Sequence, residues 1–391
     1  MTQEYFLEQA RLWNNIDLSG YAWTWKSYIV NKYAEEKESD WYTIVRVAPT
    51  WIAAMNIWWS TIHKTFRLNW NNYFKKSKQN IDWNYVDIII FDEDSMINWL
   101  MFQYCHDILK DNCKWNLPWW WKQIICIGDN AQLPPIFNMK DPLAVKQYEY
   151  LNSNFGWITF DKSQAYKDWQ FIKINLTEYQ RSHDSYFNSL LSQLRDWDLN
   201  ILKEFKYEWY SSQFYNKATH IFATNNEVDN MNYERLLKLS WKQFLFKWII
   251  RWDFNMDNVL VPEELRLKVW ARIMIVKNLA NWLVNWDTWE ILFIDILNMN
   301  IKILSDRFEK EFAIWLETWN NIVYDEHWNQ EKKWSLKQFP IKLWWRITRH
   351  KSQWLTIEKV IFHYKKWLSQ ELIYTSISRW ISYDNTYVVY N

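Results

Sequence analysis

Hydrophobic residues in the first third of the chain form short runs, and each run ends where a polar motif begins. Amphipathic stretches separate the runs, as expected for helices that cross between strands. Parallel strands need such long connections, so the pattern predicts a parallel sheet within an α/β fold. Ligands of these sheets bind at the carboxyl ends of the strands, which makes the polar motifs the first candidates for a site. The four runs are Asn15–Ser19, Thr43–Ala48, Val86–Phe91 and Gln123–Ile127.

A second series of strand-like runs predicts a second α/β domain, and the segment 265–343 has a different pattern. Its apolar runs are short and separated by turn signals, which favours a small barrel-like insertion within the second domain. The second series comprises Phe171–Leu176, Thr219–Ala223, Val360–His363 and Thr386–Tyr390. The predicted domains are 1–172, with a short wedge insertion at about 64–85; 173–264 together with 344–391; and the insertion 265–343.

Composition changes this picture, because the chain has 34 tryptophans and only 3 glycines in 391 residues. Ordinary usage is about 7% glycine, or roughly 27 residues here. Tryptophan repeatedly follows Asn or Asp, where Asn-Gly and Asp-Gly turns would need positive φ. We therefore hypothesise that the gene reads UGA as glycine and that the printed sequence translates it as tryptophan. Such positions are Trp70, Trp83, Trp197, Trp282, Trp286 and, two residues after Asp287, Trp289.

A genuinely tryptophan-rich protein that stacks aromatic rings is the alternative to recoding. Sequencing the codons decides between them, because UGG at these positions would exclude the recoding hypothesis.

Charge and cysteine content limit the class of protein. Lys and Arg number 46 against 45 Asp and Glu, so the net charge of +1 indicates no overall attraction to nucleic acid or membrane. A polyanion site must then be a local channel. Cys105, Cys113 and Cys126 are too few and too poorly spaced for a zinc site or a disulfide framework. No run approaches about 18 apolar residues, and Met1–Asn15 does not resemble a signal peptide. We expect a reduced, cytoplasmic protein with no membrane partner.

The first polar motif follows the first predicted strand and becomes G-x-x-x-x-G-K-S if Trp25 is glycine. Glycines let backbone N–H groups close around phosphate oxygens, Lys26 would reach the β- and γ-phosphates, and the Ser27 hydroxyl would bind Mg²⁺. As printed, the Trp25 indole would occupy the phosphate space. The alternative is a chance turn before a helix. The predicted nucleotide-binding residues of this loop are Gly20, Trp23, Thr24, Trp25, Lys26 and Ser27.

Two further motifs follow predicted strands. Asp92 could hold Mg²⁺ at the end of 88–92, and Glu93 could orient and deprotonate an attacking water. A strand that merely ends at a solvated edge is the alternative. After the next strand, the segment 128–135 places the Gln132 amide where it could sense the γ-phosphate. The alternative is an ordinary loop that ends in prolines.

The order of the motifs resembles that of superfamily 1 DNA helicases of the RecD-like and PIF-type group. The resemblance covers nearly the whole chain and adds the segments 177–182, 350–354 and 374–379 to the motifs above. It implies two RecA-like P-loop NTPase domains with an SH3-like β-barrel insertion in the second. It also implies ATP and Mg²⁺ as cofactors, and glycine where Trp25, Trp270 and Trp354 are printed. Trp345 stands where the family itself has tryptophan.

The same resemblance implies roles for individual residues. Gln3 occupies the position of an adenine-reading glutamine, and Arg181 and Arg379 occupy positions that reach the γ-phosphate from the second domain. Without the resemblance, His63 and His350 would read as core or loop histidines. The implied single-strand DNA contacts are Pro49, Thr50, Thr61, His63, His350, Lys351, Ser352 and Gln353.

These observations predict an ATP-dependent DNA helicase that moves on single-stranded DNA and acts at duplex junctions as a monomer, and the resemblance implies 5′ to 3′ movement. Two departures from the family favour hydrolysis over strand separation: the segment between His63 and Val86 is short, and Gln180 precedes Arg181. A single-strand-stimulated ATPase or translocase without strand separation is therefore one alternative. A non-enzymatic, tryptophan-rich nucleic-acid-binding protein is the other.

Overall fold

The computed structural model divides into two compact units, which are described separately. Unit 1 comprises Met1–Asn216 and Arg349–Asn391, and unit 2 comprises Lys217–Thr348. The structure describes residues 2–21, 24–49, 60–68, 81–113, 122–135, 137, 142–155, 158–178, 184–205, 218–251, 261–277, 279, 288–305, 310–324, 330–348, 359–380 and 382–390.

The core of unit 1 is a six-stranded parallel sheet in the order β3-β2-β4-β5-β1-β6. The four runs predicted in the first third form its centre, so the predicted parallel α/β sheet is confirmed. The strands are β1 (Ile16–Gly20), β2 (Ile44–Ala48), β3 (Ser60–Thr61), β4 (Ile88–Asp92), β5 (Gln123–Gly128) and β6 (Ile172–Leu176).

Strand β6 corrects one prediction. The run Phe171–Leu176 was expected to open a second domain, but β6 pairs in parallel with β1, with Ile174 opposite Leu18 and Leu176 opposite Gly20. Ile174 and Leu176 are buried in the same hydrophobic cluster as Leu18. The burial of these side chains at the edge of the first sheet explains the pairing, which the order of runs along the chain does not reveal.

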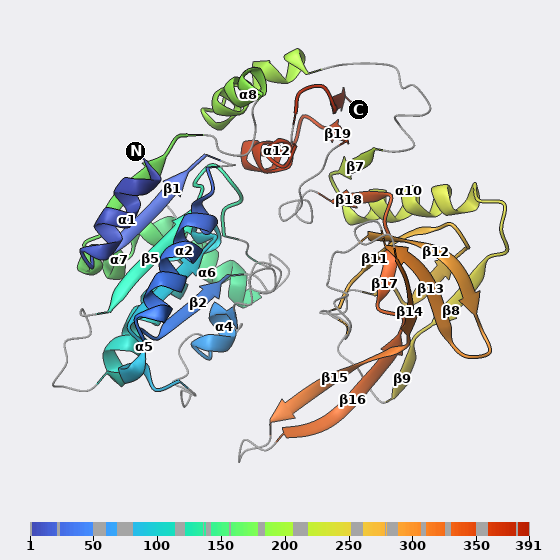
Figure 1. Cartoon of the computed structure of the whole chain (residues 1–391), viewed down its shortest axis with the longest axis horizontal. Helices are drawn as coiled ribbons and strands as arrows, with labels where there is room; N and C mark the ends of the chain where they lie inside the picture. The colour runs from blue at the N-terminus through green and yellow to red at the C-terminus, as the bar shows by residue number, and fades with distance from the viewer. Residues whose placement is uncertain are drawn as a thin grey trace. The chain divides into compact units, whose positions relative to one another are not determined.

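Helices cover both faces of this sheet (Figure 1). On one face, α1 (Gln3–Arg11) and α2 (Lys26–Ser39) pack on Ile88 and Ile90 of β4. On the other, α5 (Trp99–Asn112) and α7 (Gln164–Trp169) pack on Ile89 and Phe91. Burial on both faces accounts for the nearly continuous apolar runs of the strands. Shorter elements near the sheet are α4 (Ile62–Thr65), η1 (Trp83–Tyr85), η2 (Asp94–Met96), α6 (Pro142–Phe155) and η4 (Phe160–Lys162).

The remainder of unit 1 contains α8 and α12, which contribute to the candidate site. Phe187 of α8 and Trp380 both contact Phe205 edge to face. The elements are α8 (Ser185–Arg195), η5 (Leu199–Glu204), β19 (Val360–Tyr364), α12 (Gln370–Ile377) and β20 (Thr386–Tyr390), with β19 and β20 parallel. Both C-terminal runs predicted as strands are therefore strands.

Unit 2 contains the β-rich segment that the sequence predicts. A five-stranded antiparallel sheet in the order β14-β13-β12-β11-β17 buries Ile273, Trp289 and Ile303. Its strands are β11 (Arg272–Ile275), β12 (Thr288–Asp295), β13 (Asn300–Ser305), β14 (Glu311–Trp315) and β17 (Ile341–Leu343). The SH3-like barrel and the three predicted domain limits remain predictions.

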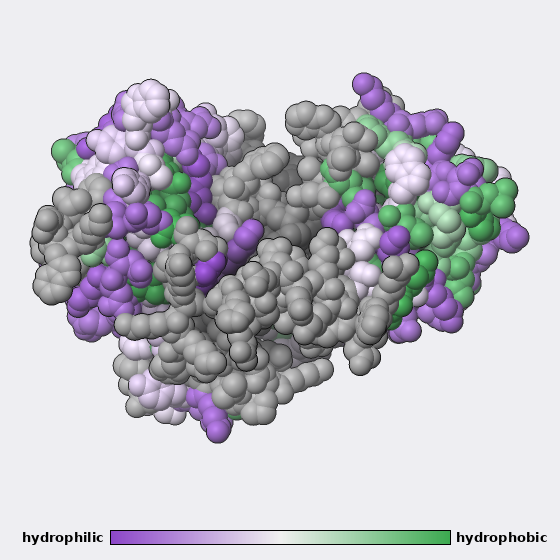
Figure 2. Space-filling view, turned by 90° about the horizontal axis from the view of Figure 1, so that it is seen from below, coloured by the Kyte–Doolittle hydropathy of each residue, from purple (hydrophilic) through white to green (hydrophobic). Residues whose placement is uncertain are grey.

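Smaller elements complete unit 2. They are β7 (Thr219–Phe222) parallel to β18 (Arg346–Thr348), β8 (Phe244–Lys247) with β10 (Glu264–Leu267), β9 (Ile249–Arg251) with β16 (Gln330–Gln338) and β15 (Glu317–Tyr324), and the helix α10 (Asn225–Leu237). Hydrophilic residues are spread among hydrophobic ones over the face of the molecule in Figure 2.

Several tryptophans have the backbone conformation that the predicted turns require. Among the described residues, nine non-glycine residues have positive φ, and five of these are tryptophans. They include Trp25, Trp197 and Trp270, with φ of 57°, 69° and 65°. L-residues pay roughly 1–2 kcal/mol for this conformation, which glycine adopts freely.

Trp83 and Trp289 do not fit that pattern. Trp83 begins the 3₁₀ helix η1, is fully buried and stacks on Phe66 at 4.6 Å between ring centroids. Trp289 is a fully buried residue of β12. The expectation of a left-handed turn at these two positions is wrong, because each ring is held in a hydrophobic core. The codon hypothesis itself remains a prediction.

Candidate functional site

The loop after β1 closes around the Lys26 side chain. Lys26 begins α2, and its Nζ donates to the carbonyl oxygens of Gly20 (2.8 Å) and Tyr21 (2.9 Å). A Cβ on Gly20 would lie 2.6 Å from the Leu176 carbonyl oxygen, so β6 leaves room only for glycine. Burial lowers the pKa of Lys26, whereas the nearby carboxylates of Asp129 and Glu93 raise it. The unpaired N–H groups at the start of a helix attract anions, so this loop suits phosphate.

The residue before Lys26 has the backbone of a glycine. Trp25 has φ 57° and ψ 35°, and its side chain is 43% exposed and packs on Tyr28 at 5.1 Å between ring centroids. The predicted loop residue Thr24 is buried and donates from Oγ1 to the Tyr21 carbonyl. Gln3 of α1 donates from Nε2 to the Thr24 carbonyl at 3.1 Å, which brings the predicted adenine-reading residue to the loop. Trp23 lies outside the described residues.

Three consecutive carboxylates begin at the last residue of β4. Asp92 is buried, and one of its carboxylate oxygens accepts from the Glu93 backbone N–H at 2.9 Å. Burial first, and then the charge of Glu93, raises the pKa of Asp92 to about 8. Burial also raises the pKa of Asp94 well above its ordinary value. Glu93 has φ 53°, a conformation that is uncommon for a residue with a side chain and that concentrates at functional sites.

The residues present fit a magnesium ion. Ser27 in the first turn of α2 and Asp92 at the end of β4 offer hydroxyl and carboxylate oxygens, the hard ligands that Mg²⁺ prefers. A divalent cation beside Asp92 would favour its ionised form, which burial opposes in the structure.

The turn after β5 brings the C-terminal arginine to the site. Gln132 is buried, and its side-chain oxygen accepts from Nη2 of Arg379 at 2.8 Å. These two residues are 247 positions apart, and both were predicted from the sequence. Gly128 is required at the end of β5, because an added Cβ would lie 1.7 Å from the Asp94 side-chain oxygen.

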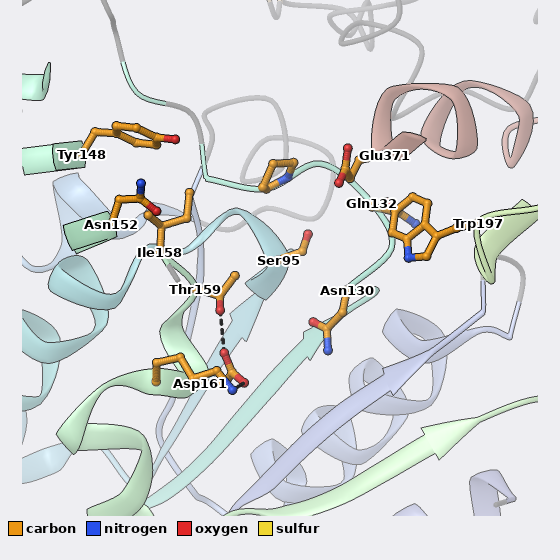
Figure 3. A pocket seen from close by; sticks show the side chains of 12 residues that line it. Ser95, Asn130, Gln132, Tyr148, Asn152, Ile158, Thr159, Asp161, Trp197 and Glu371 are labelled. Atoms are coloured by element: carbon orange, nitrogen blue, oxygen red, sulfur yellow. Dashed lines mark hydrogen bonds and ion pairs between the residues drawn. The ribbon is translucent and has the colours of Figure 1, made fainter. Parts of the chain in front are cut away.

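A cavity of about 480 Å³ opens beside Gln132 (Figure 3). Tyr148 and Asn152 of α6 line one side, and Gln132, Trp197 and Glu371 line the other. In its wall the Thr159 hydroxyl donates to Asp161 at 2.6 Å. Gln132, the predicted γ-phosphate sensor, therefore lines this cavity and also contacts Arg379.

The described DNA-contact candidates lie together at the edge of the sheet. Ala48 of β2 pairs with Thr61 of β3, so Pro49 and Thr61 lie at the carboxyl ends of neighbouring strands. The Thr61 hydroxyl caps α4 by accepting from the Lys64 N–H. His63 is buried, and burial lowers its pKa to about 4. The predicted residues Thr50, Arg181, His350, Lys351, Ser352 and Gln353 lie outside the described residues.

The pKa of His63 predicts a pH effect on stability. This pKa lies below the ordinary value of 6.5, so the unfolded chain binds a proton at His63 more readily than the folded protein does. The stability contributed by neutral His63 is therefore fully present above pH 6.5 and is lost progressively as the pH falls towards 4. We expect the wild type to lose on the order of 3 kcal/mol more than His63→Leu over this range. Urea unfolding of both proteins at several pH values measures the difference, and parallel pH profiles would contradict it.

Three residues of the site were not predicted from the sequence: Asp129, Arg195 and Tyr374. Asp129 accepts from Arg195 and from the Tyr374 hydroxyl. Asp129 and Tyr374 stand inside motifs that the sequence singled out, so the motifs were the available signal. Arg195 ends a helix outside those motifs.

Comparison with known proteins identifies the family. The sequence model described as PIF1-like helicase matches residues 9–204, half of the chain. The chain belongs to the PIF1-like helicase family. Within the described part of this PIF1-like chain, no helix is long and apolar enough to cross a membrane.

Among curated proteins, the ATP-dependent DNA helicase Pif1 of Campylobacter jejuni is 28% identical over 395 residues, covering 91% of this chain and 84% of the relative. The PIF1 helicase of Saccharomyces cerevisiae is 26% identical over 306 residues, covering 72% of this chain but only 34% of the longer yeast protein.

Solved PIF1 structures share the fold. The Pif1 helicase of Candida albicans superposes with a TM-score of 0.78 at 23% identity, covering 99% of this chain and 94% of that one. Bacteroides Pif1 bound to single-stranded DNA gives 0.77 at 23% identity, covering 99% and 91%. The predicted fold with two RecA-like domains is confirmed.

Proposed function

We propose that this chain is an ATP-dependent DNA helicase that moves along single-stranded DNA and unwinds duplex at single-strand junctions. The observation that carries the proposal is the contact of Arg379 with Gln132, beside a phosphate loop whose lysine is in place and two carboxylates at the end of β4. Family membership supports the same activity, since the curated relatives are ATP-dependent DNA helicases.

Each predicted site residue has a distinct role in hydrolysis. Lys26 and the first turn of α2 bind the phosphates, and Gln3 contacts the adenine. Ser27 and Asp92 would hold Mg²⁺, which would supply positive charge to neutralise the phosphates. Glu93 orients the attacking water and accepts its proton, while Gln132 and Arg379 contact the γ-phosphoryl group. Arg181 acts as a second arginine on that group.

Single-stranded DNA runs across both RecA-like domains. Pro49, Thr50 and Thr61 contact it from the first domain, with the buried His63 behind Thr61, and residues 350–353 contact it from the second. Closure of the domains on ATP and their opening after hydrolysis move the strand, with 5′ to 3′ movement as in the family that the sequence resembles. The proposal includes a first domain of residues 1–172 extended through β6, a second domain made of the rest of 173–264 with 344–391, the SH3-like insertion 265–343, and a monomeric cytoplasmic protein.

We expect saturating single-stranded DNA to raise the ATPase rate about tenfold or more, because the nucleotide and strand-contact motifs alternate along the chain. Steady-state hydrolysis with and without an oligonucleotide measures this. Lys26→Ala is the control and should be inactive in both conditions. A rate that DNA leaves unchanged would contradict the proposal.

A translocase without strand separation is the second candidate, favoured by the short segment between His63 and Val86. A forked-duplex unwinding assay beside the ATPase assay separates the two functions. DNA-stimulated hydrolysis without strand separation would support the translocase.

A further inference from the structure

The carboxylate of Asp129 joins three separate elements. Asp129 follows β5 directly and is only 1% exposed. One of its oxygens accepts from Nε of Arg195 at 3.1 Å, and the other accepts from the Tyr374 hydroxyl at 2.8 Å. Arg195 is the last residue of α8, and Tyr374 belongs to α12. Both oxygens of a buried acid are thus bonded to helices that lie far from it in sequence.

Arg195 also reaches the phosphate loop. Its guanidinium group lies over the Tyr21 ring, 4.8 Å from the centroid, and the Tyr21 carbonyl accepts from Lys26. Burial lowers the pKa of Arg195, but Asp129, Tyr374 and Tyr21 together raise it above its ordinary value. The arginine therefore lies as a cation between the phosphate loop and the turn after β5.

The contacts of Asp129 flank the contact between Gln132 and Arg379. The Gln132 N–H donates to the Asp129 carbonyl at 2.8 Å, so the two residues share one turn. On the other side, the Ser378 N–H donates to the Tyr374 carbonyl at 2.8 Å, which ties Tyr374 to the residue before Arg379. Two hydrogen bonds thus connect the same pair of segments, Asp129 with Tyr374 and Gln132 with Arg379.

We propose that Asp129 is a positioning residue that holds α8 and α12 against the turn after β5 and thereby aims Arg379 at the transferring phosphoryl group. This inference rests on the proposed ATPase function. Asp129 is buried and both of its carboxylate oxygens accept hydrogen bonds from protein side chains, so we assign it to positioning and not to contact with the substrate. Misplacing a group that stabilises the transition state by about 1 Å can cost on the order of a hundredfold in rate.

The first test compares kcat with KM for ATP in the full chain at saturating single-stranded DNA. Asp129→Asn keeps the shape but removes the charge, and Tyr374→Phe removes one hydroxyl. We expect each to lower kcat, Asp129→Asn by about tenfold or more, with KM changed less than about threefold. Tyr383→Phe is the matched control: its hydroxyl donates to the Glu204 carbonyl, away from Asp129, and should leave kcat unchanged.

The second test is a double-mutant cycle with Arg379→Ala. If Asp129 acts through Arg379, Asp129→Asn costs little further activity once Arg379 is removed. The proposal would be overturned if the kcat losses of the two single variants multiplied in the double variant. It would also be overturned if Asp129→Asn raised KM and left kcat unchanged. Tyr374→Phe serves in the same cycle if Asp129→Asn melts at a much lower temperature than the wild type. A wild-type rate for Lys26→Ala would instead overturn the proposed ATPase function itself.

Discussion

A full chain with glycine at the suspect tryptophan positions is expected to bind ATP and to melt at a higher temperature than the printed chain. Trp25, Trp197 and Trp270 have left-handed backbones, which cost roughly 1–2 kcal/mol each for residues with a Cβ. Trp13 and Trp41 share this conformation. Five such sites together are comparable with the roughly 5–15 kcal/mol that keeps a typical domain folded. Replacing Trp25 also removes an indole ring from the residue directly before Lys26.

Melting temperatures with and without ATP and Mg²⁺ measure this effect, since a ligand that binds the folded state raises the melting temperature. Trp345→Gly is the matched control. Trp345 packs against the core of unit 2 and stands where the family has tryptophan, so its loss should destabilise the protein. The codon hypothesis would be refuted if the printed chain melted cooperatively and ATP raised its melting temperature as much as that of the glycine chain. The other suspect positions are Trp51, Trp58, Trp59, Trp282, Trp286 and Trp354, whereas Trp289 is left unchanged because its ring is buried in the core of unit 2.

Arg379→Ala is expected to lower ATP hydrolysis by about a hundredfold or more while leaving ATP affinity nearly unchanged. An arginine that reaches the γ-phosphoryl group stabilises charge that develops in the transition state, so its loss reduces turnover more than ground-state binding. The contact with Gln132 places Arg379 beside the predicted γ-phosphate sensor.

Single-turnover hydrolysis and equilibrium binding of a fluorescent ATP analogue measure the two quantities separately. Arg379→Lys tests geometry, since lysine keeps the charge but loses the planar fork of donors. Equal losses in affinity and turnover would show that Arg379 is a structural arginine.

Local patterns predicted the strands around the nucleotide loop because each element carries its own signal. Within the predicted strand Val86–Phe91, the continuous apolar run Ile88–Phe91 lies in β4 and is buried on both faces of the sheet. The pairing of β6 with β1 carries no such signal, since any strand can be the next neighbour in a parallel sheet. The partners of Asp129 lie 66 and 245 positions away, and hydrogen bonds at that separation depend on the folded arrangement of three elements.

The tryptophan positions also show the limit of prediction from local sequence. A ring after an acidic residue reads as a turn at both Trp83 and Trp197, yet Trp83 is fully buried and Trp197 is in a left-handed turn. Only the surroundings of each ring separate the two cases.

The pairing of β6 with β1 also determines where the chain leaves the first sheet. Gly20 lies opposite Leu176, and the Tyr21 N–H donates to the Leu176 carbonyl at 3.1 Å. The last residue of β6 is therefore anchored to the base of the phosphate loop. One backbone hydrogen bond thus links the end of the first sheet to the loop that is proposed to bind phosphate.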